Sequence, residues 1–129
     1  MKYFLSLGSN IDPTENLDAA IIALSEILDS MKCSSIHKTR AEGFEGEDFL
    51  NLVISGSTSL SFQVLNKKLK SIEDAAGRNR EAPKFSSRTL DIDIVLQLSD
   101  EDEILFESDE IAKYSFEIGR AHAELQSRL

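Results

Sequence analysis

The sequence predicts a single domain, residues 1–129, with an α+β fold in which helices pack on an antiparallel sheet. Two segments, one after Pro13 and one after Ser61, carry apolar residues at the three- and four-residue spacing of amphipathic helices. Short apolar segments such as 49–58 alternate with period two, which is typical of strands. The order strand, helix, strand, strand, helix, strand is the split βαβ arrangement of ferredoxin-like sheets.

The first half of the chain supplies one helix and the strands around it. Residues 2–7 form a short predicted strand that ends at Gly8, and a helix follows with Asp12 as its N-cap and Pro13 in its first position. The residues expected on the buried face of this helix are Leu17, Ala20, Ile21, Leu24, Ile27 and Leu28. The next predicted elements are a strand, a loop and a strand, at residues 33–40, 41–48 and 49–58.

The second half of the chain supplies another helix, a basic loop and the last predicted strand. The helix begins near Ser61 and ends at Gly77, a residue type that suits the position just after a helix. Its apolar stripe contains Phe62, Leu65, Leu69, Ile72 and Ala76. The strand is predicted from Thr89 to about Leu98, and residues 109–129 are predicted to be helical.

Composition excludes several classes of protein. A net charge of −9 argues against a general nucleic-acid-binding protein. No apolar run is long enough to span a membrane, and the first ten residues lack the pattern of a signal peptide, so we expect a cytoplasmic protein. The single cysteine, Cys33, permits neither an internal disulfide nor a multi-cysteine zinc site.

Charges of opposite sign are segregated along the chain. Residues 100–110 contain seven acidic residues and no basic one, whereas residues 78–88 contain four basic residues and one acidic residue. A basic patch this small suits a compact anion better than a long polymer. The acidic segment is a candidate contact for a protein partner.

Asp91 and Asp93 are the strongest candidates for a functional site. They interrupt an apolar strand, and their carboxylates lie side by side because residues two apart on a strand point to the same face. Adjacent carboxylates repel each other unless a cation lies between them, and Mg²⁺ prefers such oxygen ligands together with phosphates. Alternatively, the pair forms a solvated strand face with ion pairs to Arg78 or Arg88. The arginines favour a metal-bound polyphosphate, because guanidinium groups match phosphate oxygens.

Other candidate residues have ordinary structural explanations. Asn51 lies in an apolar strand, so its amide is either a structural cross-link or a contact for the edge of a heterocycle. Phe49 and Phe116 are more typical of a core than of a stacking platform. Glu73 is expected on the solvated face of the second helix. The turn "LGSN", residues 7–10, is explained by the conformational freedom of its glycine.

Three segments together resemble the 6-hydroxymethyl-7,8-dihydropterin pyrophosphokinase family of folate biosynthesis. They are "LGSNIDPTENLDAAIIAL", "FLNLVISGSTSLSFQVLNKKLKSIEDAAGR" and "RTLDIDIVL". The resemblance extends from about residue 3 to about residue 98, and the spacing of LGSN, F-L-N, I-E-x-x-x-G-R-x-R and R-T-L-D-x-D is specific. It implies a ferredoxin-like fold and the transfer of pyrophosphate from ATP to the hydroxymethyl group of the pterin, with release of AMP.

The resemblance also implies roles for individual residues. Two Mg²⁺ ions are expected between the ATP phosphates and the pair Asp91 and Asp93. The residues expected at ATP are Glu73, Arg78, Arg80 and Arg88. Of these, Arg78 and Arg88 are expected to be catalytic. The residues expected at the pterin are Thr39, Phe49, Asn51 and Phe116.

The chain departs from the family pattern at several positions. Phe85 stands where members have a tryptophan and Gly-Pro, Ser108 lies near the place of a histidine that contacts ATP, and Tyr114 lies near that of an arginine. The chain also ends sooner than typical members. These departures leave a second hypothesis open, a degenerate, non-catalytic homologue that binds a nucleotide, a pterin or a protein partner.

Overall fold

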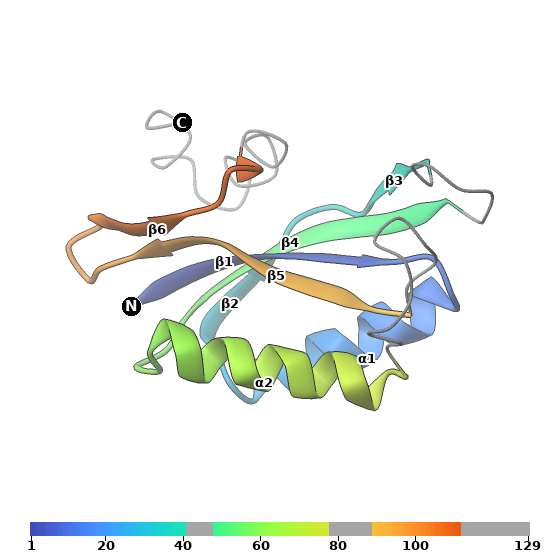
Figure 1. The fold of residues 1–129 in the computed structure, drawn as a ribbon, viewed down its shortest axis with the longest axis horizontal. Helices are drawn as coiled ribbons and strands as arrows, with labels where there is room; N and C mark the ends of the chain where they lie inside the picture. Colours follow the sequence, from blue (N-terminus) through green and yellow to red (C-terminus); the bar gives the residue numbers. More distant parts are fainter. Residues whose placement is uncertain (41–47, 78–88, 112–129) are drawn as a thin grey trace.

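The computed structural model describes residues 1–40, 48–77 and 89–111, which form a six-stranded sheet with both helices on one face (Figure 1). The elements in chain order are β1 (Lys2–Ser9), α1 (Pro13–Ser25), β2 (Asp29–Cys33), β3 (His37–Thr39), β4 (Phe49–Ser57), α2 (Phe62–Ala75), β5 (Asp91–Leu98) and β6 (Ile104–Glu107). The strand order is β2-β4-β1-β5-β6, β3 also pairs with β4, and all pairs are antiparallel. The predicted α+β fold is confirmed.

The central strand β1 is buried on both of its faces. Tyr3, Leu5 and Leu7 point into the main core, which fills the space between the sheet and the two helices. Phe4 points the other way and packs with Val95 and other apolar residues of β4 and β5. Since β4 and β5 flank β1, residues at the end of β1 lie between these two strands.

The helix boundaries agree with the signals in the sequence. α1 begins at Pro13, and α2 is capped by Ser61, whose Oγ accepts a hydrogen bond from the Val64 amide at 3.3 Å. Gly77 follows α2 with a φ of 84°, which glycine adopts without strain. Asp12 precedes α1 as predicted, but its side chain makes no capping hydrogen bond.

The strand predicted at residues 33–40 is wrong in its extent. The chain forms two strands, β2 and β3, which pair with successive parts of the same edge of β4. Between them, the Ser34 amide donates to the Val53 carbonyl and the Val53 amide donates to Ser34 Oγ. A serine hydroxyl therefore replaces one backbone acceptor at the break between the two strands.

The acidic segment 100–110 contains a strand that the sequence analysis did not predict. β6 pairs with the second half of β5, and the ring of Phe106 lies 4.7 Å from the ring of Phe62 on α2, measured between centroids. Four residues are too few to show a clear alternation, so this strand depends on its tertiary contacts. The helix predicted at residues 109–129 lies almost wholly outside the described residues.

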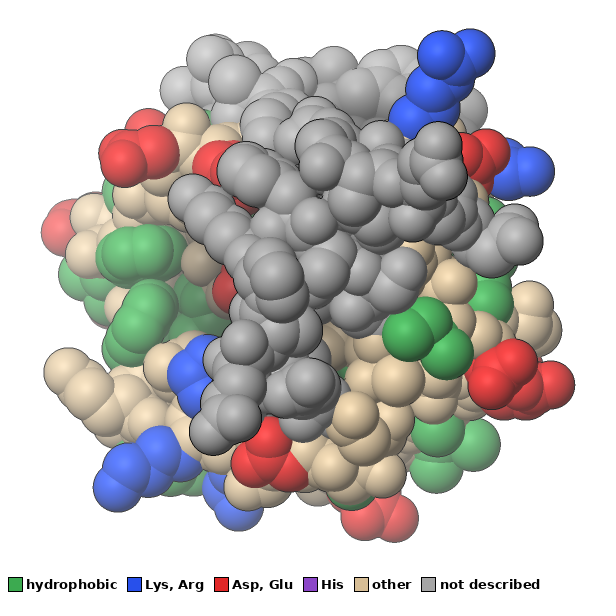
Figure 2. All heavy atoms as spheres, turned by 45° about the vertical axis from the view of Figure 1, so that its right-hand side comes forward, with side chains coloured by type: hydrophobic (Ala, Val, Ile, Leu, Met, Phe, Trp, Pro, Cys, Tyr) green, Lys and Arg blue, Asp and Glu red, His purple; other side chains and the backbone are tan. Residues whose placement is uncertain are grey.

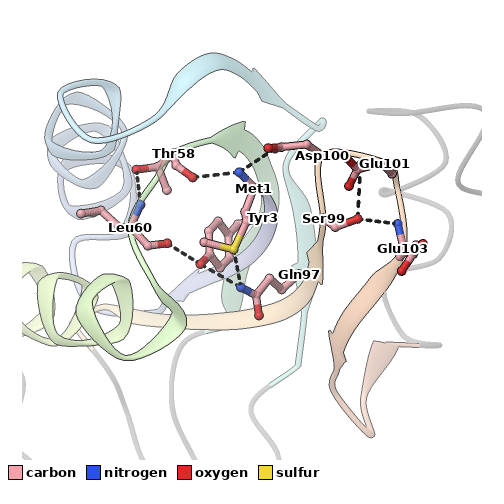
Figure 3. Close-up of polar contacts among 9 residues, drawn as sticks. All are labelled: Met1, Tyr3, Thr58, Leu60, Gln97, Ser99, Asp100, Glu101 and Glu103. Atoms are coloured by element: carbon pink, nitrogen blue, oxygen red, sulfur yellow. Dashed lines mark hydrogen bonds and ion pairs between the residues drawn. The ribbon is translucent and has the colours of Figure 1, made fainter.

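A polar cluster fixes the end of the sheet far from Asp91 (Figure 3). The Tyr3 hydroxyl donates to the Leu60 carbonyl at 2.7 Å and accepts a hydrogen bond from Gln97 Nε2 at 3.1 Å. These contacts join β1, β5 and the segment before α2. Ser99 Oγ accepts hydrogen bonds from two backbone amides of the turn that leads to β6.

The described surface carries groups of several kinds. In Figure 2, acidic side chains lie at several separate places, and hydrophobic side chains gather at the left of the view. The large apolar side chains that are exposed are Ile11, Ile22, Ile36, Val64, Ile104 and Leu105. Within the described ranges, neither helix has the length and apolar character needed to cross a membrane.

Gly56 supplies the first testable prediction. A Cβ at this position would lie 2.7 Å from Leu28 Cβ and 3.3 Å from the Asp29 carbonyl oxygen, so alanine overpacks the contact between β4 and the chain after α1. We expect Gly56→Ala to lower the free energy of unfolding by about 2 kcal/mol, measured by urea denaturation. The exposed substitution Ser59→Ala is the control, and an unchanged urea midpoint for Gly56→Ala would contradict the prediction.

Candidate functional site

Asp91 and Asp93 lie on the face of the sheet opposite the helices. Their neighbours Leu90, Ile92 and Ile94 are buried in the main core between the sheet and the helices. Because side chains alternate along a strand, the two carboxylates share the other face, as the sequence predicts. Asp91 is half-buried and Asp93 is exposed, so the pair is accessible to a ligand.

The sheet register places three site positions in one row. Asn51 on β4 is paired with Gly8 on β1, and Gly8 is paired with Asp91 on β5. Since neighbouring strands are about 4.8 Å apart, the backbones at Asn51 and Asp91 are separated by roughly 10 Å. The register therefore brings the predicted pterin contact close to the predicted metal pair.

The middle of this row has no side chain of its own because residue 8 is glycine, and the side chains of Asn51 and Phe49 pack against it. A Cβ on Gly8 would lie 2.9 Å from Asn51 Oδ1 and 3.7 Å from Phe49 Cδ1. Alanine would therefore push against the Asn51 amide. The prediction that a turn and the conformational freedom of its glycine explain LGSN is wrong, because Gly8 lies inside β1 and does not have a positive φ. What this position requires is the absence of a side chain next to Asn51.

The Asn51 amide joins β4 to β3. Its Nδ2 donates a hydrogen bond to Thr39 Oγ1 at 2.8 Å and another to the His37 carbonyl at 3.5 Å. The structural cross-link that the sequence left open is therefore present. Because both donor contacts are on the β3 side, Oδ1 faces Gly8 and is placed to accept a hydrogen bond from a ligand. Thr39 and Asn51, both predicted at the pterin, are thus in direct contact.

Glu73 is not on a solvated face, so that prediction is wrong. Its side chain is 1% exposed, and Oε2 accepts a hydrogen bond from the Ile92 backbone amide at 2.7 Å. Glu73 continues the i, i+4 spacing of Leu65 and Leu69, the other two buried residues of α2. This spacing indicates that residue 73 is buried, but the prediction followed the usual exposure of glutamate.

Negative charge accumulates around Asp93. Partial loss of solvent raises the pKa of Asp93 to about 6, and the charges of Asp91, Glu73 and Glu110 act in the same direction, in that order. Lys70 opposes them. Part of the Asp93 side chain is exposed to water, but its pKa stays raised because the neighbouring carboxylates repel its negative charge.

This donor set fits Mg²⁺. The ion binds hard oxygen ligands and usually takes one or two carboxylates, with water and phosphates completing its shell. Asp91 and Asp93 supply two such carboxylates. Loss of solvent, and then the charge of Asp91, raises the pKa of Asp93, and a bound cation favours the ionised form that both effects disfavour. Among the described residues, no cluster of three or more His, Cys, Asp or Glu side chains could hold a metal.

The remaining predicted site residues lie outside the described ranges. They are Arg78, Arg80, Arg88 and Phe116. Phe49 is described and half-buried, and it lies beside Gly8. The structure thus brings Thr39 and Asn51 into contact and places Phe49 and Asn51 beside Gly8, which is paired with Asp91. Glu73 binds the backbone between the two aspartates.

Comparison with known proteins gives the family. The model of the 7,8-dihydro-6-hydroxymethylpterin-pyrophosphokinase (HPPK) family matches residues 4–124. The chain belongs to this family. The resemblance inferred from its motifs is confirmed, and the range of the HPPK match contains every predicted site residue, including the arginines of segment 78–88.

Curated relatives agree with HPPK membership. The chain is 41% identical over 95 residues to the 2-amino-4-hydroxy-6-hydroxymethyldihydropteridine pyrophosphokinase of Aquifex aeolicus, covering 72% of this chain and 59% of the relative. The Haemophilus influenzae protein of that name is 36% identical over 97 residues, with 72% and 60% covered. A folate synthesis bifunctional protein of Chlamydia caviae is 37% identical over 100 residues, with 71% and 22% covered. The chain thus spans about three fifths or less of these relatives.

Proposed function

We propose that the protein is a Mg²⁺-dependent pyrophosphokinase that transfers pyrophosphate from ATP to the hydroxymethyl group of 6-hydroxymethyl-7,8-dihydropterin and releases AMP. One observation carries the proposal: in a member of the HPPK family, Asp91 of the carboxylate pair lies in register with Asn51 across Gly8. This arrangement places a metal-binding group and a polar ring contact on one accessible sheet face. Small molecules, and not nucleic acid or membrane, are the proposed ligands.

Asp91 and Asp93 would hold Mg²⁺, and the resemblance to the family implies that two ions bind. When bound, these ions neutralise phosphate oxygens and make the β-phosphorus easier to attack. We assign Arg78, Arg80 and Arg88 to the triphosphate, where guanidinium groups donate paired hydrogen bonds to phosphate oxygens. Arg78 and Arg88 are the proposed catalytic residues, because charge on the transferred group must be balanced as the bond to AMP breaks.

The pterin would bind over β4. Asn51 Oδ1 accepts a hydrogen bond from a ring N–H, Thr39 holds the Asn51 amide in place, and Phe49 and Phe116 cover the ring faces. The hydroxymethyl group then points along the row toward Asp91.

The chemistry fixes a discriminating test. The hydroxyl oxygen of the pterin bonds to the β-phosphorus, the bond from that phosphorus to the α,β-bridging oxygen breaks, AMP leaves with this oxygen, and the hydroxyl proton passes to solvent. With Mg²⁺ and the pterin, ATP and β,γ-methylene-ATP should both yield AMP, whereas α,β-methylene-ATP should yield none. Chromatography of the nucleotides and ³¹P NMR of the pterin product measure this.

Other outcomes would contradict the proposal. Formation of ADP would indicate transfer of a single phosphoryl group. Nucleotide binding without AMP release would support the non-catalytic homologue. The cytoplasmic location and a protein contact through residues 100–110 stay predictions.

Gly8→Ala tests the path between the two substrates. The added methyl displaces Asn51 Oδ1, which the contact with Thr39 prevents from turning freely. We expect the KM for the pterin to rise about tenfold, the cost of one neutral hydrogen bond. The KM for ATP should change less than twofold, because ATP binds beyond Gly8, and equal effects on both values would contradict this layout.

A further inference from the structure

Two side chains hold the backbone of β5 on either side of Asp91. Ser9, at the end of β1, donates a hydrogen bond from Oγ to the Thr89 carbonyl, two residues before Asp91. Glu73, on α2, accepts the hydrogen bond of the Ile92 amide, one residue after Asp91. Both side chains are buried, at 0% and 1% exposed. The strand that carries the metal pair is thus anchored from two different elements.

The Glu73 contact replaces a strand pairing. β1 pairs with β5 from Asp91 onward on one side, but β6 pairs with β5 only at Leu96–Leu98 on the other. In the described part of the chain, the Ile92 amide therefore depends on a side chain for the acceptor that a buried N–H requires. Among the described residues, Glu73 supplies this acceptor where no strand pairs with β5 beside the aspartates, on the side where we expect ligands to approach.

Ser9 gives the LGSN segment, residues 7–10, a role beyond that of its glycine. Its hydroxyl lies within hydrogen-bonding distance of two carbonyl oxygens, that of Thr89 and that of Ile11 at 3.1 Å. It therefore joins the end of β1 and the start of α1 to the start of β5. Gly8, the residue before Ser9, is paired with Asp91. Two adjacent residues of β1 therefore hold the start of β5, Gly8 through backbone pairing and Ser9 through its side chain.

We propose that Ser9 and Glu73 are positioning residues that set the spacing and direction of the Asp91 and Asp93 carboxylates for metal binding. The inference rests on the proposed function of that pair. It assigns Glu73 an action through the β5 backbone, in place of the nucleotide contact that the family resemblance implies. Mg²⁺ demands near-ideal octahedral geometry, so a small shift of β5 changes its affinity.

The test compares variants that keep or lose each hydrogen bond. Glu73→Gln keeps an acceptor oxygen for the Ile92 amide, whereas Glu73→Ala and Ser9→Ala lose the anchoring atom. Electron paramagnetic resonance of Mn²⁺ with α,β-methylene-ATP measures metal affinity without turnover, and circular dichroism verifies folding. We expect Glu73→Gln to bind Mn²⁺ within about threefold of wild type and both alanine variants to lose about tenfold or more.

Specific results would overturn the inference. Folded alanine variants that bind Mn²⁺ as the wild type does would reduce both residues to a structural role. Equal losses in Glu73→Gln and Glu73→Ala would show that the charge of Glu73 acts directly. If an alanine variant does not fold, amide hydrogen exchange tests the proposal. The Ile92 amide should be protected from exchange in the wild type and in Glu73→Gln. Rapid exchange of this amide in the wild type would overturn the proposal. A wild type that binds Mn²⁺ but releases no AMP would overturn the proposed function while the variant series still supports positioning.

Discussion

Replacing Asp93 with asparagine should lower kcat for AMP release about a thousandfold, the upper end of what the loss of one preorganised electrostatic contact costs. Asparagine keeps the shape and one oxygen ligand but removes the negative charge that holds Mg²⁺. The rate is measured at saturating Mg²⁺, ATP and pterin. Asp18→Asn, on an exposed position of α1, is the matched control and should leave the rate unchanged. A loss below tenfold in Asp93→Asn would contradict the metal role.

The same substitution should stabilise the metal-free protein. Since the pKa of Asp93 is raised to about 6, its charge costs the native state free energy at neutral pH. Asp93→Asn removes this cost, and we expect a gain of about 1 kcal/mol, less than the pKa shift alone gives because the side chain is partly exposed and screened. If the pair were a strand face in stabilising ion pairs, the variant would lose stability. The sign of the change in melting temperature therefore separates the two explanations that the sequence left open.

Local patterns predicted the elements whose residues carry their own signal. β1, α1, β4, α2 and β5 each show the period of their structure, and Ser61 and Gly77 mark the ends of α2. β6 and the break between β2 and β3 show no such period. These elements depend on pairing with β5 and β4. Their contacts, with Phe62 for β6 and with Val53 for the break, are to residues distant in the sequence, so local sequence patterns do not predict them.

The site residues also divide into those that a local sequence pattern identifies and those that depend on distant contacts. Asp91 and Asp93 were found because a two-residue spacing in a strand fixes a shared face. Glu73 was misplaced because its partner, the Ile92 amide, is 19 residues away and belongs to the backbone. The role of Gly8 required the register of three strands, since only then does its missing side chain lie between Asn51 and Asp91.

Metal binding should weaken steeply in mild acid. A proton and a metal ion compete for the Asp93 carboxylate, whose pKa of about 6 lies well above its ordinary 3.8. Between about pH 7 and about pH 5 the ionised fraction falls about tenfold, so we expect the affinity for Mn²⁺ alone to fall about tenfold as well. Titration without nucleotide excludes the protonation of ATP itself. An affinity for Mn²⁺ that does not change with pH over this range would contradict the raised pKa of Asp93.

The stability of the metal-free protein should change in the opposite direction. Well below pH 3.8, Asp93 is protonated in both the native and the unfolded state and contributes nothing to the free energy difference between them. As the pH rises from 3.8 to about 6, the unfolded chain loses this proton before the native state does, so the free energy of unfolding falls. This decline should be weaker in Asp93→Asn than in Asp18→Asn, and saturating Mg²⁺ should reverse it above about pH 6 by binding only the native state. The ionised Asp93 carboxylate, which loss of solvent and the charge of Asp91 make costly in the metal-free protein, is thus the same group that a divalent cation stabilises.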